Sequence, residues 1–306
     1  MESGPMEWVS PDVLAGLEAE GTDAHRLATG PDFWLERFGA NLLLSYQTEK
    51  GRDELLAEIG QRCAGYGLEV QRIFGKYLPL AASERGAPVL LREEMGGTLE
   101  TEAREAGVRY GLDFGGGYSA GLFIDQRANR ARVRTSQPKR LLNTFAYTCS
   151  FSVVGALAGA ETVSVDLSRR SLTRGEENFR RNGLETDGHK FIADDVLGVL
   201  PRLARRGERF DTIILDPPTF SRNQAGKAFQ VQRDFDQLVV LALEVAAPGA
   251  RLLLSVNHSE MQVADLERAG RGALRMAGRS GRFQASAALP DFPMGHGAKT
   301  VWLEVS

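Results

Sequence analysis

From residue 140 to the C-terminus, short apolar runs alternate with amphipathic segments of helical length. Five runs recur: RLLNTFAY (140–147), TVSVD (162–166), KFIAD (190–194), FDTIILD (210–216) and ARLLLSV (250–256). Apolar strands of this kind, joined by helices, are typical of a parallel sheet that is covered on both faces. We therefore predict an α/β domain over residues 135–306.

The preceding part of the chain has a different pattern. Residues 51–63 carry apolar side chains at helical spacing, and several strand-like segments follow, the last being GLFIDQR (121–127). These features predict a small α+β domain over residues 41–134. Residues 1–40 mix Pro, Gly and acidic residues with a few aromatic side chains, and we expect a partly helical extension that docks through the aromatics.

The formal net charge of -3 is unevenly distributed over the 306 residues. Residues 1–126 contain 11 Lys and Arg against 21 Asp and Glu, whereas residues 127–306 contain 26 against 19. Charge asymmetry between the parts of a chain indicates contact with nucleic acid. The composition, with 42% hydrophobic and 25% charged residues, excludes a disordered or coiled-coil protein.

The sequence contains no recognisable targeting, membrane or metal-binding signal. Its start, MESGPMEWVS, lacks the apolar stretch of a secretory signal, and no run approaches the ~18 apolar residues that span a bilayer. Cys63 and Cys149 are the only cysteines and have no metal-ligand spacing. We therefore expect a soluble, cytoplasmic protein with reduced thiols, no membrane contact and no metal.

Three carboxylates follow predicted strands, at the edge where open α/β sheets bind ligands. Asp166 ends the second strand, 23 residues after Asn143, and an acid there suits two ribose hydroxyls. Asp195 follows the third strand; it either accepts a hydrogen bond from an adenine amine or caps the next helix, and both interpretations stay open. Asp216 ends the fourth strand.

The loop after the first strand, NTFAYTCSFS (143–152), has no GxGxxG sequence and therefore no sign of a phosphate cradle. This absence disfavours a nicotinamide or flavin dinucleotide. An adenosine cofactor without phosphates fits better, and S-adenosylmethionine is the obvious candidate. We expect Asn143, Phe145 and Tyr147 to contribute to its site.

DPPTF (216–220) is the most informative pentapeptide of the chain. Its two prolines fix the backbone after Asp216 and remove two N–H donors, which leaves a rigid loop facing a ligand. Phe220 offers a flat surface on which an extruded base could stack, worth ~1–3 kcal/mol. We predict that Asp216, Pro217 and Phe220 form the reactive corner; the alternative is a simple strand end with Phe220 in the core.

Six segments, in this order, make the chain resemble a known family. They are GLFIDQRANR (121–130), NTFAYT (143–148), VSVDLS (163–168), ENFRRNGL (177–184), ILDPPTF (214–220) and FQVQRDF (229–235). Over roughly residues 100–306, the sequence resembles the class I S-adenosylmethionine-dependent methyltransferases that act on large-subunit ribosomal RNA. The resemblance implies a Rossmann-like sheet of seven strands, the last antiparallel and formed by KTVWLEV (299–305).

The resemblance also implies roles for individual residues. Asp166 would bind the ribose, Asp195 the adenine edge, and Asp216 with Pro217 the methionine end beside the target base. The residues that it places beside the cofactor are Phe123, Asp125, Gln126 and Arg127.

The sequence departs from the family members that methylate cytosine C5. Those members use a nucleophilic cysteine after the strand that matches ARLLLSV, where this chain has Asn257 and His258. C5 attacks only after a thiolate has added to C6, and Asn257 and FQVQRDF resemble the guanine-N7 members of the family. We therefore favour transfer to guanine N7 by direct displacement.

Several alternatives stay open. They are cytosine-C5 methylation, methylation of a protein or small molecule, and a relative that binds cofactor or RNA without catalysis. Cys149 motivates the last, because the family has glycine there and a side chain could crowd the methionine moiety; the other interpretation is a small buried side chain. The chain is also too short for the RNA-binding β-domain with which cytosine-C5 members usually begin.

The segment RANRARVRTSQPKR (127–140) has six basic residues and no acid. Phosphate contacts need such a cluster. We predict that ribosomal RNA binds at Arg130, Arg132, Arg134 and Arg140, the alternative being a solvated face. The sequence leaves a homodimer open.

Overall fold

The structure is a computed structural model that describes residues 6–79, 86–93, 96, 98–223, 226, 228–293 and 296–306. It divides into two compact units. The first comprises Met1–Ile124 and Leu289–Gly295, and the second comprises Asp125–Ala288 and His296–Ser306. The chain therefore passes between the units at three points.

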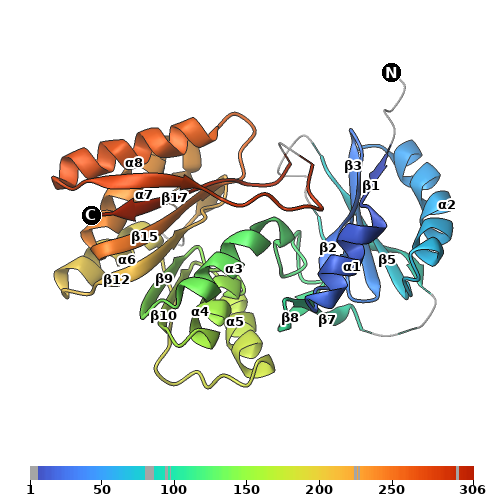
Figure 1. Ribbon diagram of the computed structural model, residues 1–306, viewed down its shortest axis with the longest axis horizontal. Helices are drawn as coiled ribbons and strands as arrows, with labels where there is room; N and C mark the ends of the chain where they lie inside the picture. The colour runs from blue at the N-terminus through green and yellow to red at the C-terminus, as the bar shows by residue number, and fades with distance from the viewer. Residues whose placement is uncertain are drawn as a thin grey trace. The chain divides into compact units, whose positions relative to one another are not determined.

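The second unit contains a seven-stranded sheet in the order β11-β10-β9-β12-β15-β17-β16 (Figure 1). Its strands are β9 (Arg140–Thr144), β10 (Glu161–Asp166), β11 (Lys190–Ala193), β12 (Phe210–Leu215), β15 (Ala246–Val256), β16 (Gly281–Ala285) and β17 (Lys299–Val305). Strands β9 to β12 and β15 run parallel, whereas β17 is antiparallel to both of its neighbours. The predicted Rossmann-like sheet and its antiparallel strand at residues 299–305 are confirmed.

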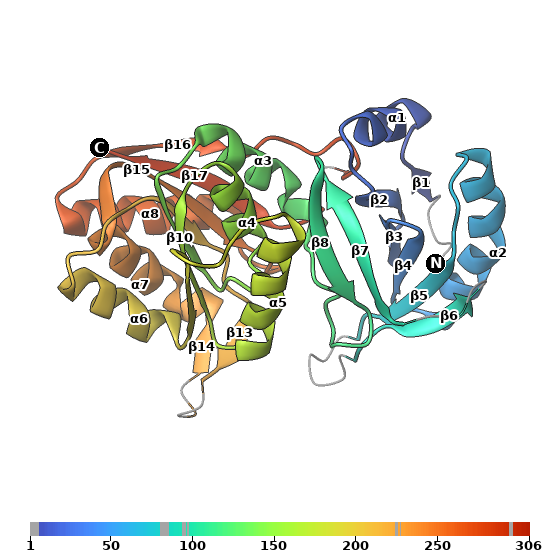
Figure 2. The same ribbon diagram turned by 90° about the horizontal axis from the view of Figure 1, so that it is seen from below.

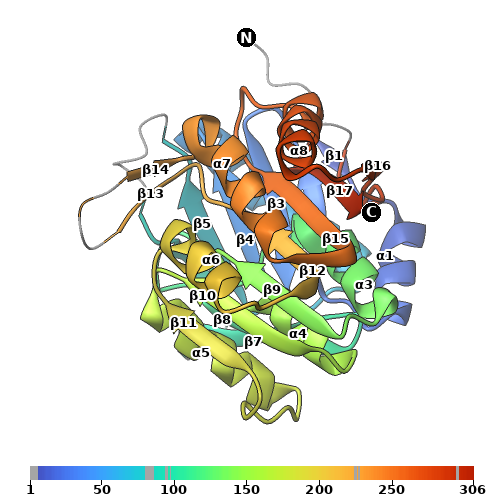
Figure 3. The same cartoon turned by 90° about the vertical axis from the view of Figure 1, so that its left-hand side faces the viewer.

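Helices cover both faces of this sheet (Figure 3). One layer contains α3 (Arg127–Ser136), α4 (Ser150–Leu157) and α5 (Arg169–Arg181); the other contains α6 (Val196–Arg205), α7 (Val231–Glu244) and α8 (Val263–Ala277). Leu142, Ile213 and Leu252 belong to the core shared with the second layer. Because successive strand residues point to opposite faces, their buried neighbours Ile214 and Leu253 face the first layer. A short hairpin of β13 (Phe220–Arg222) and β14 (Ala228–Gln230) precedes α7.

The boundary between the units lies at Ile124, earlier than the predicted boundary at residue 134. Residues 127–136 form α3 of the second unit, and this helix buries Asn129 and Val133. The strand predicted at residues 121–127 is also wrong, since Ile124–Gln126 form a 3-10 turn that leads directly into α3.

The first unit contains a sheet in the order β1-β2-β3-β4-β5-β6 (Figure 2). Its elements are β1 (Glu7–Trp8), α1 (Pro11–Ala19), β2 (Ala24–Thr29), β3 (Phe33–Phe38), β4 (Asn41–Tyr46), α2 (Glu49–Gly65), β5 (Arg72–Tyr77) and β6 (Val89–Glu93). Helix α2 connects β4 to β5, which are parallel, and both helices pack on one core through Leu14, Leu55 and Ile59. A separate hairpin is formed by β7 (Glu100–Glu105) and β8 (Val108–Asp113).

The predicted N-terminal extension over residues 1–40 is wrong for its described part, which supplies three strands of this sheet. Strand β2 escaped the prediction because all of its residues are buried, although two of them are His25 and Arg26. Arg26 is neutralised by Glu36 of β3, at 3.1 Å. The segment Leu289–Gly295 also belongs to the first unit. There the Asp291 carboxylate accepts a hydrogen bond from the backbone N–H of Arg26 at 2.9 Å.

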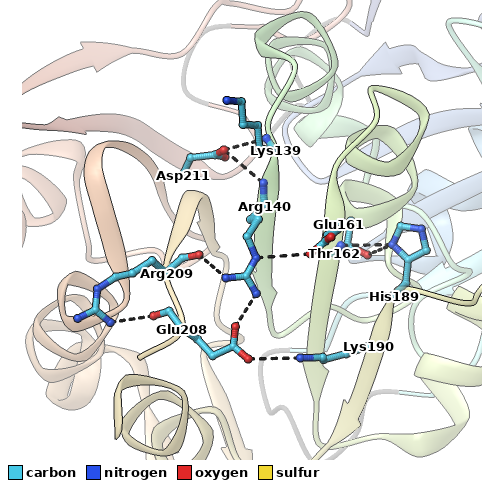
Figure 4. A network of polar contacts seen from close by, with 9 residues as sticks. All are labelled: Lys139, Arg140, Glu161, Thr162, His189, Lys190, Glu208, Arg209 and Asp211. Atoms are coloured by element: carbon cyan, nitrogen blue, oxygen red, sulfur yellow. Dashed lines mark hydrogen bonds and ion pairs between the residues drawn. The ribbon is translucent and has the colours of Figure 1, made fainter. Parts of the chain in front are cut away.

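Polar contacts connect the amino ends of the central strands in the second unit (Figure 4). Arg140, at the start of β9, bonds to Glu208 at 2.5 Å and to the Arg209 carbonyl at 2.8 Å, and lies 3.6 Å from Glu161. The prediction that Arg140 binds RNA is therefore corrected. Its charge is paired at the sheet edge opposite the one where an α/β sheet binds ligands.

His189 lies at the same edge and should make stability depend on pH. Its Nδ1 accepts the Thr162 N–H at 3.2 Å, and burial lowers the pKa of the ring. The stabilisation should be present above the unfolded pKa of ~6.5 and be lost as pH falls below it, because protonated Nδ1 cannot accept. Urea unfolding at pH 8 and pH 5.5 should show a larger loss of unfolding free energy for the wild type than for His189→Gln. Equal losses would contradict this assignment.

Candidate cofactor and reaction site

The sheet topology determines where a ligand can bind in the second unit. The chain leaves β9 toward β10 on one side and later returns to β12 on the other, so the strand order reverses between β9 and β12. Ligands of open α/β sheets bind at the carboxyl ends beside such a point. Thr144 pairs with both Val165 and Leu215, so the residues that follow them, Asp166 and Asp216, flank the loop after β9.

The loop after β9 has an unusual backbone. Phe145, Tyr147 and Cys149 have positive φ angles of 52°, 48° and 61°, although none of them is glycine. Such conformations are costly and persist where the surroundings enforce them, commonly at functional sites. Here the Ala146 N–H donates to the Val165 carbonyl at 3.0 Å, and Asn178 of α5 donates to the Thr148 carbonyl at 3.0 Å.

Asp166 connects this loop to the start of α5. Its Oδ2 accepts the Tyr147 N–H and its Oδ1 accepts the Ser168 N–H, each at 2.8 Å. Burial raises the pKa of the carboxyl group, and the two N–H donors oppose that rise. The side chain stays half-buried, and each oxygen retains a second acceptor site for a ligand hydroxyl.

Asp195 caps helix α6. Its Oδ1 accepts the Leu197 N–H at 3.1 Å, so the capping interpretation is confirmed. Its Oδ2 accepts from the Asn223 side chain at 2.9 Å, which connects the cap to the segment after β13. Binding of an adenine edge by Asp195 stays a prediction.

Asp216 occupies the most unusual electrostatic position in the site. Burial raises the pKa of its carboxyl group to about 6, and nearby Asp125 contributes to the rise. Ser255 donates to Oδ1 at 2.6 Å, and Gln126 donates to Oδ2 at 3.3 Å. The hydrogen bond from Ser255 and the positive charge of Arg130 oppose the rise. A carboxyl group that titrates close to physiological pH, at a strand end, marks a candidate functional site.

The DPPTF loop turns away from the sheet after Asp216. Pro217 is buried, whereas the Phe220 side chain is 51% exposed. The alternative that places Phe220 in the core is therefore wrong. Thr219 donates to the Asn257 carbonyl at 3.0 Å and connects this loop to the residues after β15. An exposed aromatic ring on an anchored loop is suited to stacking against a base.

Cys149 does not face the open end of the sheet. The residue is fully buried, and its side chain packs against Gly175 of α5. Burial raises the pKa of the thiol to about 12, so it stays protonated. The interpretation of Cys149 as a small buried side chain is confirmed.

The predicted RNA-binding arginines of α3 have different environments. The prediction that Arg130 binds RNA is corrected, because this residue is buried and contacts Ser150 at 3.5 Å. Its positive charge instead favours the ionised form of Asp216. Arg132 is half-buried, bonds to Gln284, and lies 4.7 Å from the centre of the Trp302 ring. Arg134 is exposed.

The remaining predicted cofactor residues also differ in exposure. The prediction that Asn143 contacts the cofactor is corrected, because its side chain is buried and donates to Ser152 of α4 at 3.0 Å. Phe145 is half-buried against Phe229, while Arg127 is buried. Asp125 accepts the Ala298 N–H at 2.9 Å. Phe123 belongs to the first unit, where its side chain is 47% exposed.

Sequence reasoning missed Ser255, the polar residue that contacts Asp216 most closely. The sequence feature that could have revealed it is the single hydroxyl residue near the end of the apolar run ARLLLSV. This run lies in β15, which pairs with β12, and Asp216 directly follows β12. His258 lies just beyond; its Nδ1 accepts the Glu260 N–H at 3.2 Å within its own turn.

Among the described residues, no His, Cys, Asp and Glu side chains gather into a group that could hold a metal ion. No helix in the described part of the chain is long and apolar enough to cross a membrane.

Known proteins resemble both the sequence and the fold. A family model described as S-adenosylmethionine-dependent methyltransferase matches residues 76–302. Ribosomal RNA large subunit methyltransferase I of Cronobacter sakazakii is 30% identical over 266 residues, which cover 81% of this chain and 64% of that protein. Ribosomal RNA large subunit methyltransferase K/L of Psychrobacter arcticus is 41% identical over 166 residues, covering 53% and 21%. The chain thus spans at most 64% of the length of these two relatives.

A solved structure shows the same fold. The protein SMU.776, in complex with SAH, superposes with a TM-score of 0.81 at 24% identity. The superposition covers 94% of this chain and 76% of that one. At this identity the similarity concerns the fold alone.

The contact between Cys149 and Gly175 gives a testable prediction. A Cβ atom at position 175 would lie 2.8 Å from the Cys149 Cβ and closer still to its sulfur. We expect Gly175→Ala to lower the free energy of unfolding by ~1–3 kcal/mol through overpacking. Adding Cys149→Gly should restore most of the loss, because it removes the clash and relieves a positive φ angle. A urea-unfolding double-mutant cycle measures both effects, and strictly additive losses would rule out the contact as their cause.

Proposed function

Because the chain belongs to the family of S-adenosylmethionine-dependent methyltransferases, we propose that it transfers a methyl group to a base of large-subunit ribosomal RNA. The substrate class is supported by the names of the relatives from Cronobacter and Psychrobacter. The cofactor is S-adenosylmethionine. The target atom that we propose is guanine N7.

The carboxyl edge of the sheet suits this cofactor. Asp166 has acceptor sites for two ribose hydroxyls, and Asp195 presents a carboxylate at the neighbouring strand end. No glycine-rich phosphate loop follows β9, in keeping with a cofactor that carries no phosphate. When bound, S-adenosylmethionine supplies a methyl group on a positively charged sulfur atom.

One observation supports direct displacement: the chain has no thiol placed for covalent catalysis. Its only cysteines are Cys63, buried in the first unit, and Cys149, which packs on α5. Burial raises the pKa of both thiols, to about 11 and about 12. Methylation of C5 needs a thiolate that adds to the ring, whereas the N7 lone pair of guanine needs no such step.

The reactive corner would act by positioning and charge. Phe220 offers its exposed ring for stacking, and the anchored loop holds the base against the sheet edge. As N7 bonds to the methyl carbon, the bond from that carbon to sulfur would break and the positive charge would pass from sulfur to the guanine. An ionised Asp216 beside the base would stabilise that charge. Alignment of two reactants can supply ~7–11 kcal/mol of the barrier reduction.

Exposed basic side chains of the second unit would meet the RNA backbone. Arg134 stays a proposed phosphate contact, since it is exposed on α3. Arg169 and Arg170 are exposed on the first turn of α5, directly after the strand that ends at Asp166. Exposed arginines suit RNA phosphates.

The proposed ribose site predicts the behaviour of Asp166→Ala. Loss of the carboxylate removes the acceptors for the ribose and releases the Tyr147 and Ser168 N–H groups. We expect S-adenosylmethionine binding to weaken by about 10-fold or more, since a hydrogen bond to a charged group contributes ~1.5–3 kcal/mol. Isothermal titration calorimetry measures the change. Unchanged affinity in a variant with wild-type thermal stability would refute this site.

The proposed reaction predicts both a product and a pH dependence. Incubation with deproteinised large-subunit ribosomal RNA, followed by nucleoside mass spectrometry, should yield 7-methylguanosine. The rate should fall as pH is lowered through about 6, because protonation of Asp216 removes the stabilising charge. Asp216→Ala should abolish transfer. A 5-methylcytidine product would overturn the N7 assignment, and cofactor binding without any methylated nucleoside would favour a non-catalytic relative.

A further inference from the structure

A chain of buried hydrogen bonds runs from β17 through α3 to Asp216. The Trp302 indole N–H donates to Asn129 Oδ1 at 2.9 Å, and Asn129 Nδ2 donates to Gln126 Oε1 at 2.8 Å. Gln126 Nε2 then donates to Ser255 Oγ at 2.8 Å, and Ser255 donates to Asp216 Oδ1 at 2.6 Å. Trp302, Asn129, Gln126 and Ser255 are each at most 3% exposed.

The donor-only indole determines the direction of this chain. An amide side chain can present either its oxygen or its nitrogen to a neighbour, but an indole N–H can only donate. Trp302 therefore selects the oxygen of Asn129, which leaves Asn129 Nδ2 to face the oxygen of Gln126. Gln126 in turn must point Nε2 toward Ser255 and Asp216. Both contacts that reach the carboxyl group, from Ser255 and Gln126, are donors.

The same carboxyl group is influenced by two charges. Asp125, in the turn before α3, disfavours its ionised form, and Arg130 of α3 favours that form. Burial also disfavours ionisation. Donors aimed at the carboxylate offset these costs, and hydrogen bonds in a chain strengthen one another in a medium of low dielectric constant.

We propose that Trp302 and Asn129 are positioning residues, which keep Gln126 and Ser255 oriented as donors so that Asp216 is held ionised at the reaction site. The proposal rests on the role of Asp216 in the proposed function. Neither Trp302 nor Asn129 need touch the cofactor or the base. Their effect is transmitted through the orientation of two side-chain amides.

The test uses two variants of the 306-residue chain. Trp302→Phe removes the donor that orients Asn129, and Asn129→Leu keeps the size of the side chain but removes the donor to Gln126 without adding a charge. In either variant the Gln126 amide can rotate and present its oxygen to Asp216. We expect the titration of the Asp216 carboxyl carbon, followed by NMR in protein with 13C-labelled aspartate, to move upward by about 0.5–1 pH unit. The Asp216→Asn variant identifies the signal.

Transfer to ribosomal RNA provides the second readout. The acid limb of the pH–rate profile should move upward by the same amount, with kcat reduced at pH 6.5 and the KM for S-adenosylmethionine unchanged. Trp34→Phe is the matched control, since Trp34 is a half-buried residue of β3 in the first unit. It should leave both the NMR titration and the pH–rate profile as in the wild type.

The outcomes separate positioning from simple packing. An unmoved Asp216 titration in both variants would overturn the proposal, even if their thermal stability fell. If Trp302→Phe does not fold, the near-isosteric and uncharged Asn129→Leu decides alone. The NMR titration needs no methyl transfer, so it decides the proposal even if ribosomal RNA is not the substrate.

Discussion

The pairing of β9 with β10 on one side and β12 on the other is the constraint on which the site depends. These backbone hydrogen bonds bring the ends of three strands to one edge, although Asp166 and Asp216 are fifty residues apart in sequence. The loop after β9 lies between the two acids. Its unusual backbone persists because Asp166, Asn178 and the Val165 carbonyl all bind it. The parallel sheet thus creates both the position of the site and the strain within it.

Burial and charge oppose each other at Asp216. A carboxyl group at a half-buried strand end favours protonation, and Asp125 adds to that tendency. Ser255, Gln126 and Arg130 act in the other direction. The balance leaves the group near the midpoint of its titration at about pH 6, where small changes in orientation have large effects on its charge. A site of this kind depends on the side chains that orient its hydrogen-bond donors toward the carboxyl group.

The sequence predicted the second unit well because its strands are continuous apolar runs with polar ends. Asp166, Asp195 and Asp216 were recognisable for that reason. The first unit was harder, since β2 buries His25 and Arg26 and so lacks the alternation of an ordinary strand. The RNA-binding prediction for the arginines of α3 failed in part for a related reason. A helix rich in arginine predicts a solvent-exposed face, but Arg130 is buried. Contacts such as Ser255 to Asp216 join distant segments and leave no local pattern.

The threefold passage of the chain between the units has a consequence for biosynthesis. Strand β17 is inserted between β15 and β16, and residues 289–295 complete the first unit. Neither unit can therefore acquire all its contacts until residues 289–305 have emerged from the ribosome. Domains usually fold in order during synthesis, but here the N-terminal part must wait for residues 289–295. Removal of the last twenty residues would leave two incomplete units rather than one shortened unit.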